Sequence, residues 1–291
     1  MAAASALGEE VRGVSPAREA IGRLLHNRAF VIGAVLVLLM GLIALGADWL
    51  SPYDPLRSNV RTRLRPPDAL HWFGTDHFGR DLMARVMFGA RISLAIGFMV
   101  VVATGIAGTL IGAVSGFFAR LDQPVMRVMD ALMAFPSIVL AMVVSAVLGA
   151  SVTNVVIALA IATTPHTARI VRASVLVGRE LDYVEAARAL GATDARILFR
   201  HVLANALGPL IVRLTYVFAI AILAEAALSF VGAGPPPPAP SFGSIIANGR
   251  DFMREAPWIT VFPGLAIIIS VLGLNLLGDG LRDVLDPRMR V

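Results

Sequence analysis

Few side chains in this sequence could carry out a reaction. The chain has no cysteine, and all 25 of its basic residues are arginines, so it offers neither a thiolate nor a lysine amine. A phosphate-binding P-loop ends in a lysine that reaches the terminal phosphates, so this chain cannot be a P-loop ATPase by itself. Its five histidines lack a ligand spacing such as H-E-x-x-H. The sequence therefore predicts no catalytic, cofactor-binding or metal-binding residues, and it indicates that any ATP is bound by another chain.

Two charged residues lie within a long apolar run. Glu225 and Arg213 are candidates for the translocation path or for a structural role, because a charge inside a membrane span is costly unless it has a partner. We favour a hydrogen-bonded structural role for Glu225. Arg213 needs a carboxylate or carbonyl partner, in this chain or in another subunit. For His166, a bond to a helix carbonyl is favoured over a proton relay.

These residues must be positioned by membrane helices. The chain is 57% hydrophobic and only 15% charged, with a mean hydropathy of +0.77, which no soluble domain matches. A bilayer requires roughly 20 mainly apolar helical residues per span. We expect spans at about 29–47, 92–118, 131–150, 152–171, 202–231 and 259–277. The third and fourth nearly touch and predict a tight helical hairpin.

The second span carries small residues on one face. Gly108, Gly112 and Gly116 follow one another at four-residue steps. This spacing lets two helix backbones approach closely, which favours association in lipid. The sequence leaves open whether the neighbouring helix belongs to this chain or to a partner subunit.

The placement of arginines predicts the orientation. They are frequent in the N-terminal segment (including Arg12 and Arg18), after the second span, between the fourth and fifth spans, and in the tail. By the positive-inside rule these four segments face the cytoplasm, which an even number of spans permits. The segment from Ser51 to Arg91 conflicts with this scheme, because it holds seven arginines and parity places it outside. The net charge of +5 needs no nucleic acid to explain it.

The segment 181–200 predicts a short amphipathic helix, a glycine turn and a second helix. Asp182 could cap the first helix with Glu185, and Gly191 suits a left-handed position after its end. Thr193 could cap the second helix. Val184, Ala187 and Leu190 fall on one face. Such a helix fits a groove in another protein; a plain connecting loop is the open alternative, and a DNA-reading helix-turn-helix is disfavoured by the spans on both sides.

One short motif in this segment resembles the EAA motif of permease subunits of binding-protein-dependent ABC importers. It consists of Glu185-Ala186-Ala187, followed after three residues by Gly191. In that family this segment is the coupling helix that docks on the ATPase subunit. The continuation matches at Leu203 but departs from the family pattern at His201 and Ala204. The resemblance implies that the ATPase-coupling residues are Glu185, Ala186, Ala187, Leu190 and Gly191.

Further ordered blocks resemble the C-type permease of oligopeptide and dipeptide importers. They cover nearly everything after Arg28 and stand at the entry to the second span, the entry to the third, the loop before the sixth, and the C-terminal signature. The blocks are Phe73–Asp76, Gly79–Asp81, Arg85, Gly89, Arg91 and Ser93; Met129–Asp130 and Phe135–Pro136; Pro235–Pro238, Pro240–Gly243, Gly249–Arg250, Ala256–Trp258 and Pro263–Gly264; and Leu276–Asp283 with Leu285–Arg288.

This resemblance implies an all-α membrane protein with six transmembrane helices of the type I ABC importer permease fold and both termini in the cytoplasm. We expect a cytoplasmic segment at 1–28, the first transmembrane helix and an external loop at 29–91, a five-helix permease core at 92–280 containing the coupling segment, and a cytoplasmic tail at 281–291.

The expected function is to form half of the path by which peptides, as oligopeptides or dipeptides, cross the bacterial inner (plasma) membrane. The implied partners are a second, homologous permease subunit, two ABC ATPase subunits or one fused ATPase that bind ATP and magnesium, an extracellular substrate-binding protein, and membrane lipid. A stand-alone secondary transporter of small solutes is the alternative, but we find no internal repeat of the kind such folds show. A membrane enzyme would need clustered reactive groups, which the spans do not supply.

Overall fold

The computed structural model describes residues 22–285. Arg12 and Arg18 of the arginine-rich N-terminal segment, and all but the first residue of the Leu285–Arg288 block, lie outside the described residues. Within 22–285 there is no strand, and a single isolated bridge pairs Thr75 with Asp81.

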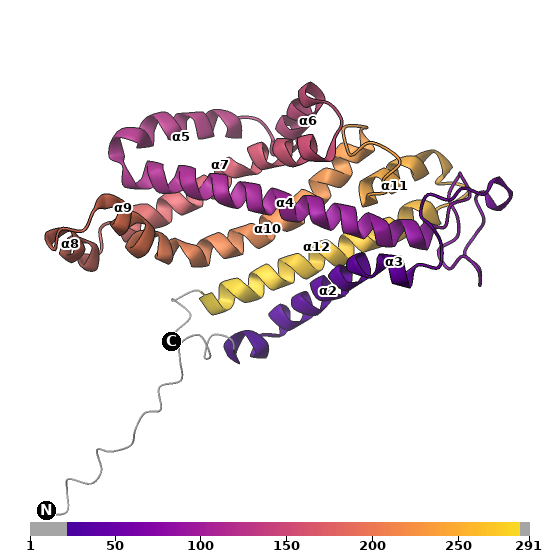
Figure 1. Ribbon diagram of the computed structural model, residues 1–291, viewed down its shortest axis with the longest axis horizontal. Helices are drawn as coiled ribbons and strands as arrows, with labels where there is room; N and C mark the ends of the chain where they lie inside the picture. The colour runs from indigo at the N-terminus through magenta and orange to yellow at the C-terminus, as the bar shows by residue number, and fades with distance from the viewer. Residues whose placement is uncertain (1–21, 286–291) are drawn as a thin grey trace, which may run out of the picture.

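Five long helices form the body of the molecule (Figure 1). They are α2 (Arg28–Leu45), α4 (Leu82–Phe117), α7 (Val152–Gly178), α10 (Leu203–Phe230) and α12 (Trp258–Leu285). The shorter elements are α3 (Ala47–Leu50), η1 (Val60–Thr62), α5 (Ala119–Met133), α6 (Ser137–Leu148), α8 (Asp182–Ala189), α9 (Asp194–Arg196), the π-helix η2 (Ile197–Val202), α11 (Phe242–Gly249) and η3 (Arg250–Phe252).

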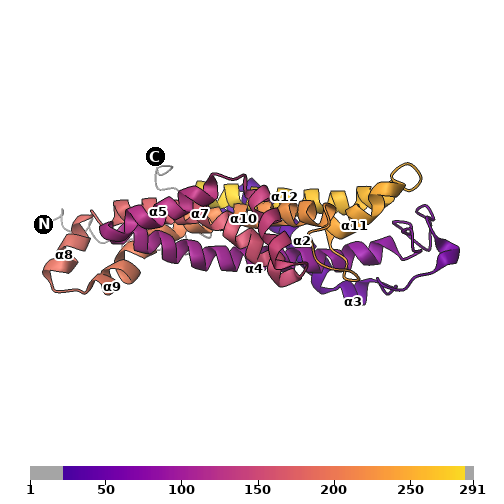
Figure 2. The same cartoon turned by 90° about the horizontal axis from the view of Figure 1, so that it is seen from above.

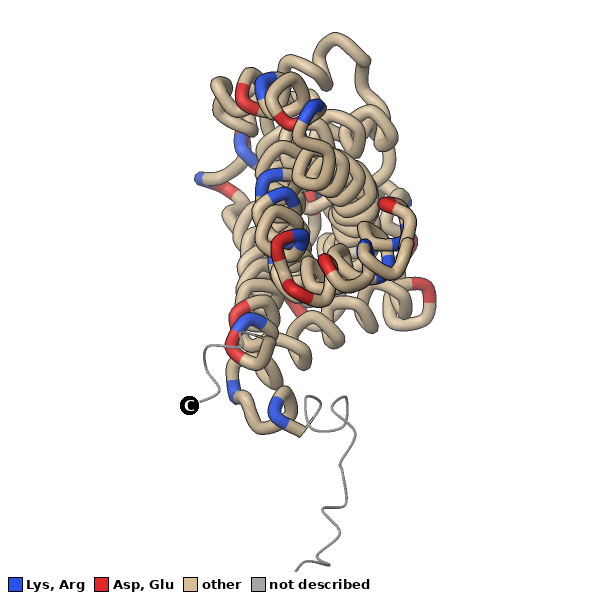
Figure 3. Tube along the Cα trace, turned by 90° about the vertical axis from the view of Figure 1, so that its left-hand side faces the viewer, with Lys and Arg blue, Asp and Glu red and all other residues tan. Residues whose placement is uncertain are grey.

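The long helices run roughly along one axis, which makes the molecule elongated (Figures 1 and 2). Helix α4 packs against α7, α2 packs against α12, and α10 contacts α4, α7 and α12. One end carries α8 and α9, and we call it the α8 end. The opposite end carries the 51–81 segment and α11, and we call it the loop end. Figure 3 looks onto the α8 end, where residues of both charges gather at the helix ends.

The expected spans are largely confirmed, with two differences in where helices begin and end. Five helices are long and apolar enough to cross a membrane, and a sixth span exists if the bent pair α5 and α6 is counted as one. Helix α4 begins at Leu82 rather than near residue 92, because the side chain of Asp81 caps it by accepting the N–H of Ala84 at 2.8 Å.

The third span was expected as one helix over 131–150, and this is wrong. Helix α5 ends at Met133, α6 begins at Ser137, and the two are bent by 90°. Pro136 stands between them in an extended conformation. A proline disfavours helical backbone in the residue before it, here Phe135, so the chain leaves one helix and starts another. The short α6 still forms the expected hairpin with α7.

The glycine face of the second span lies against α7 of the same chain. A Cβ at Gly108 would lie 2.8 Å from the Cβ of Thr167, one at Gly112 would lie 2.4 Å from the carbonyl oxygen of Ala168, and one at Gly116 would lie 2.9 Å from that of Arg172. Backbone atoms cannot move aside as a flexible side chain can. The close packing of α4 on α7 therefore depends on the absence of side chains at these three positions of α4.

A second close pair was not anticipated from the sequence. Helix α2 meets α12 so closely that a Cβ at Gly33 would lie 2.4 Å from the backbone nitrogen of Leu277, and one at Gly280 would lie 2.7 Å from that of Phe30. These glycines do not repeat at four-residue steps within one helix, so the sequence contains no spacing pattern that predicts this contact.

Four of the seven arginines of the 51–91 segment form ion pairs with nearby carboxylates: Arg65, Arg80, Arg85 and Arg91. Arg85 and Arg91 belong to α4 itself. Arg91 forms an ion pair with Asp48 at 2.8 Å and donates to the carbonyl oxygens of Ala44 and Leu45. Arg65 pairs with Asp68 at 2.6 Å. These contacts give a reason for the arginines that does not depend on the side of the membrane, which eases the conflict with the positive-inside rule.

The glycine packing predicts that a valine substitution lowers stability at a glycine of the α4–α7 contact but not at a glycine without close neighbours. Gly112→Val places atoms against the Ala168 carbonyl, and overpacking of this kind costs about 1–3 kcal/mol or more. Gly41→Val is the matched control, because a Cβ there has no neighbour within 4 Å. Thermal unfolding of the purified protein should show a lower midpoint for Gly112→Val than for the control. Equal midpoints would contradict the α4–α7 packing.

Candidate functional site

The segment 181–200 forms a compact projection at the α8 end (Figure 1). Val184 is fully buried and joins a small apolar cluster with Ile197 and Val202. The hydroxyl of Tyr183 donates to the carbonyl oxygen of His201 at 3.2 Å and accepts from the side chain of Asn205 at 2.5 Å. Helix α8 is thus attached to η2 through the apolar cluster and the His201 carbonyl, and to the beginning of α10 through Asn205.

The turn after α8 follows the glycine expectation. Gly191 has a φ of +80°, the left-handed region that favours glycine. Its N–H donates to the Arg188 carbonyl and the N–H of Ala192 donates to that of Ala187, both at 3.0 Å. This pair of bonds is a Schellman motif, which ends the helix sharply. Thr193 then caps α9 by accepting the N–H of Arg196 at 3.4 Å.

Two details of the expected segment are wrong. Asp182 does not cap α8: the cap residue is Leu181, and no side chain bonds to the cap, so the predicted pair with Glu185 does not form. Leu190 does not share the buried face of Val184. The helix ends at Ala189, and the turn leaves Leu190 89% exposed.

The surface of this projection is accessible. Glu185 and Ala186 are exposed, and Ala187 is half-buried. Leu190, Tyr183 and Leu181 add exposed apolar area around them. Solvent-exposed leucine and tyrosine beside a rigid helix are typical of a surface that another protein covers.

Helix α9 passes into α10 without a break. The π-helix η2 joins them, and the resulting rod runs from Asp194 to Phe230. The family pattern has a proline where this chain has Ala204, and Ala204 lies inside α10. The α8 projection is therefore joined to α10 by continuous helix.

Glu225 lies in this rod and is fully buried. Its carboxylate accepts from the hydroxyl of Ser93 on α4 at 3.1 Å and from that of Ser229 at 2.8 Å. The Ser93 oxygen also accepts the N–H of Phe242, the first residue of α11, at 3.1 Å. This buried network joins α4, α10 and α11 near the loop end. Hydrogen bonding of Glu225 was expected from the sequence, but its partners were not, because no local pattern links residues so far apart.

Arg213 lies on the same rod, closer to the α8 end. It is half-buried, it forms no salt bridge within residues 22–285, and its buried Nε has no hydrogen-bond partner there. It lines a cavity of about 530 Å³ together with Asn205, Tyr216 and Arg282. The carboxylate or carbonyl partner expected for Arg213 is therefore not found within residues 22–285. His166 lies exposed within α7 and makes none of the described hydrogen bonds, so the expected bond to a helix carbonyl is wrong.

A cluster of charged residues lies at the loop end. Asp76 pairs with Arg80 at 2.6 Å and with Arg85 at 3.5 Å. His71 and Asp81 meet at 2.8 Å. His77 stacks on Phe252, and burial lowers the pKa of its imidazole, which keeps it neutral near pH 7. Asp76, Arg80, Asp81 and Arg85 belong to the blocks that resemble the family, but the sequence does not say what they contact.

The chain matches two family descriptions. Residues 105–291 match the binding-protein-dependent transport system inner membrane component, and residues 15–67 match the N-terminal TM domain of oligopeptide transport permease C. A putative peptide transport system permease protein of Brucella suis is 55% identical over 279 residues, which cover 96% of this chain and 94% of that protein.

Other relatives are similar over comparable lengths. A dipeptide transport system permease protein of Alkalihalophilus pseudofirmus is 43% identical, with 97% of this chain and 93% of that protein covered. A di/tripeptide transport system permease protein of Pseudomonas aeruginosa is also 43% identical, with 95% and 93% covered. A solved structure of the MetNI methionine ABC transporter in an inward facing conformation matches in fold, with a TM-score of 0.58, 21% identity, and 70% of this chain and 97% of that chain covered.

The buried network predicts different effects for two substitutions of Glu225. Glu225→Ala removes the acceptor of two buried hydroxyls and should destabilise the protein by about 2–4 kcal/mol. Glu225→Gln keeps an acceptor oxygen and the shape, so it should cost less and should leave transport per folded molecule unchanged. Thermal unfolding and uptake by the reconstituted protein with its partners measure both. A Gln variant that is stable but inactive would identify a transport role for the carboxylate instead.

Proposed function

We propose a function from the premise that the chain belongs to the family of inner membrane components of binding-protein-dependent transport systems. It is a permease subunit of an ATP-driven ABC importer, it forms half of the translocation path, and its cargo is short peptides. The peptide, dipeptide and di/tripeptide permeases named above support this class of cargo.

The observation that carries the coupling mechanism is the α8 projection. Glu185, Ala186, Ala187, Leu190 and Gly191 form the surface that contacts an ATPase subunit. In support, Glu185, Ala186 and Leu190 are exposed while Val184 beneath them is fully buried. The ATPase can therefore push on a surface that is firmly attached to α10. ATP binding acts by favouring one arrangement of the helices over another.

The proposed assembly contains four kinds of chain. A second, homologous permease subunit completes the path, two ABC ATPase subunits or one fused ATPase hold ATP and magnesium, and an extracellular binding protein delivers the peptide. The half-buried Arg213, whose Nε has no partner within residues 22–285, supports a neighbouring subunit or cargo on that face. The five lipid-length helices support insertion into the bacterial inner membrane.

The proposed topology keeps the segments expected from the sequence. The α8 end faces the cytoplasm with residues 1–28, 181–200 and 281–291, and the loop end faces outward. The first transmembrane helix and its external loop occupy 29–91, and the permease core occupies 92–280.

A stand-alone secondary transporter is the alternative. The two proposals differ in what is needed for uptake. The chain purified alone should not import peptides into proteoliposomes, while the complex with its ATPase and binding protein should do so only with ATP. Uptake by the isolated chain without ATP would identify a secondary transporter.

The coupling proposal predicts loss of function without loss of folding. Gly191→Val strains a backbone with positive φ, and Glu185→Arg reverses an exposed charge, although a Cβ at Gly191 would meet no atom within 4 Å. The double variant should insert into the membrane and unfold at about the wild-type temperature. It should fail to retain the ATPase on purification, and its uptake rate should fall at least roughly tenfold, the equivalent of ~1.4 kcal/mol of coupling.

The matched control for this charge reversal is Asp251→Arg. Asp251 has an exposed side chain and lies in η3, near the loop end. This variant should retain the ATPase. Normal ATPase binding and uptake by the Gly191→Val, Glu185→Arg double variant would refute the coupling role.

The topology can be tested with single cysteines, since the chain has none. Ser58 and Gln123 are both exposed, the first in the 51–81 segment and the second in α5. In intact cells without an outer membrane, a membrane-impermeant maleimide should label Ser58→Cys at once and Gln123→Cys only after permeabilisation. The reverse pattern would invert the proposed orientation.

A further inference from the structure

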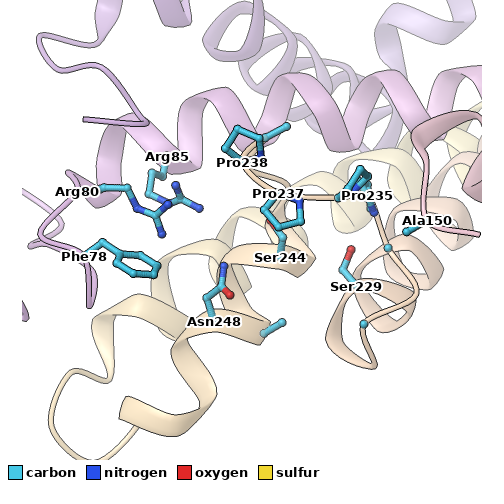
Figure 4. Close-up of a pocket in the computed structure, with 15 residues that line it drawn as sticks. Phe78, Arg80, Arg85, Ala150, Ser229, Pro235, Pro237, Pro238, Ser244 and Asn248 are labelled. Carbon is cyan, nitrogen blue, oxygen red and sulfur yellow. The ribbon is translucent and has the colours of Figure 1, made fainter. Parts of the chain in front are cut away.

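A cavity of about 420 Å³ lies at the loop end, between the start of α4, the 232–239 segment and α11 (Figure 4). Figure 4 shows the guanidinium groups of Arg80 and Arg85 next to each other on one side of this cavity, with Phe78 beside them and Asn248 across from them. Pro235, Pro237 and Pro238 line another side. We call it the loop-end cavity.

The charge in this cavity is not balanced by the residues around it. Two guanidinium groups face one carboxylate, Asp76. That carboxylate is already saturated, because it also accepts the N–H groups of Phe78 at 2.8 Å and Arg80 at 3.0 Å. The side chains of Arg80 and Arg85 are only 11% and 3% exposed. Charges this deeply buried are normally paired, so the surplus positive charge makes this cavity suited to an anion.

The donors of the two arginines are only partly used. Arg80 binds Asp76 through Nε, and one terminal nitrogen of Arg85 donates to the carbonyl oxygen of Pro55 at 3.2 Å. No other hydrogen bond of either guanidinium occurs within residues 22–285. A guanidinium presents its donors as a fork that matches a carboxylate.

The remaining walls suit the end of a peptide. Prolines have no N–H group, so the stretch Pro235–Pro238 offers apolar rings and carbonyl oxygens only. Asn248 adds an exposed amide. A cavity of this size lies in the range used for small ligands, roughly 300–1,000 Å³. A terminal carboxylate on the arginines would leave the last side chain against the proline rings.

We propose that the loop-end cavity receives the C-terminal carboxylate of the transported peptide, and that Arg80 and Arg85 bind it. This rests on the proposed function as a peptide permease. The same carboxylate chemistry could come from an acidic side chain of the binding protein, and the experiments below separate the two sources. The proposal assigns a role to the Phe73–Asp76 and Gly79–Asp81 blocks that coupling to the ATPase does not explain.

The first experiment removes one positive charge from the cavity without leaving a buried carboxylate unpaired. Arg80→Gln leaves Asp76 paired with Arg85, so no unpaired carboxylate is created. Uptake by the assembled transporter is measured for a peptide and its C-terminal amide, chosen so that the isolated binding protein binds both equally. Arg80→Gln should raise the KM of the free acid roughly tenfold, with kcat unchanged, and leave the amide unaffected.

Two further variants serve as controls for this test. Arg80→Lys keeps the charge and should restore part of the difference between acid and amide. Arg57→Gln makes the same charge change at an exposed arginine of the same segment that does not line the cavity, and it should change neither KM. An equal loss for acid and amide in Arg80→Gln would overturn the proposal.

The second experiment identifies the source of the carboxylate and does not require a charge variant. Ala247→Cys places a single thiol of this subunit in the cavity wall. Reaction with a small thiol reagent should be slowed by the peptide-loaded binding protein and not by the substrate-free protein or by one loaded with the amide. Equal protection by the substrate-free protein would assign the cavity to docking instead. If the wild-type complex imports no peptide with ATP, the proposed function itself fails, which is a different result.

Discussion

The close approach of helix backbones along α4 is the constraint on which the rest of the structure depends. Between helices in lipid there is no hydrophobic drive, so association relies on packing at short range. Gly108, Gly112 and Gly116 permit that packing against α7. Helix α7 ends at Gly178, directly before the projection that carries α8. The position of the candidate coupling surface is therefore set by the contact between α4 and α7.

Polar groups act at the two ends of this packed body. At the α8 end, Arg172 of α7 binds Asp122 of α5 through two bonds of 2.5 and 2.6 Å, which holds the bent pair α5 and α6 beside the body. Near the loop end, Glu225 links α10 to α4, and through Ser93 to the start of α11. Both are hydrogen-bonded arrangements, which is the condition for keeping charge in or near an apolar environment.

The rod from Asp194 to Phe230 connects these ends. It begins under the α8 projection, passes Arg213 and reaches Glu225, whose hydrogen-bond network joins it to α11 at the wall of the loop-end cavity. The continuous helix connects the proposed ATPase-coupling surface with the region proposed to receive the peptide. The π-helix η2 keeps the helical path continuous from α9 into α10.

The sequence by itself determined the membrane class, five of the six spans, the glycine face of α4 and the left-handed turn at Gly191, because each depends on local periodicity or on one residue's backbone preference. The sequence also indicated the family, because the family's motifs occur in it in the expected order. Only the tertiary structure decided that α7 meets the α4 glycines, that α2 meets α12, and that Arg65, Arg80, Arg85 and Arg91 are paired with Asp48, Asp68 and Asp76. It also corrected the exposure of Leu190 and divided the third span at Pro136. These outcomes depend on which residues distant in sequence come together, and no local pattern encodes that.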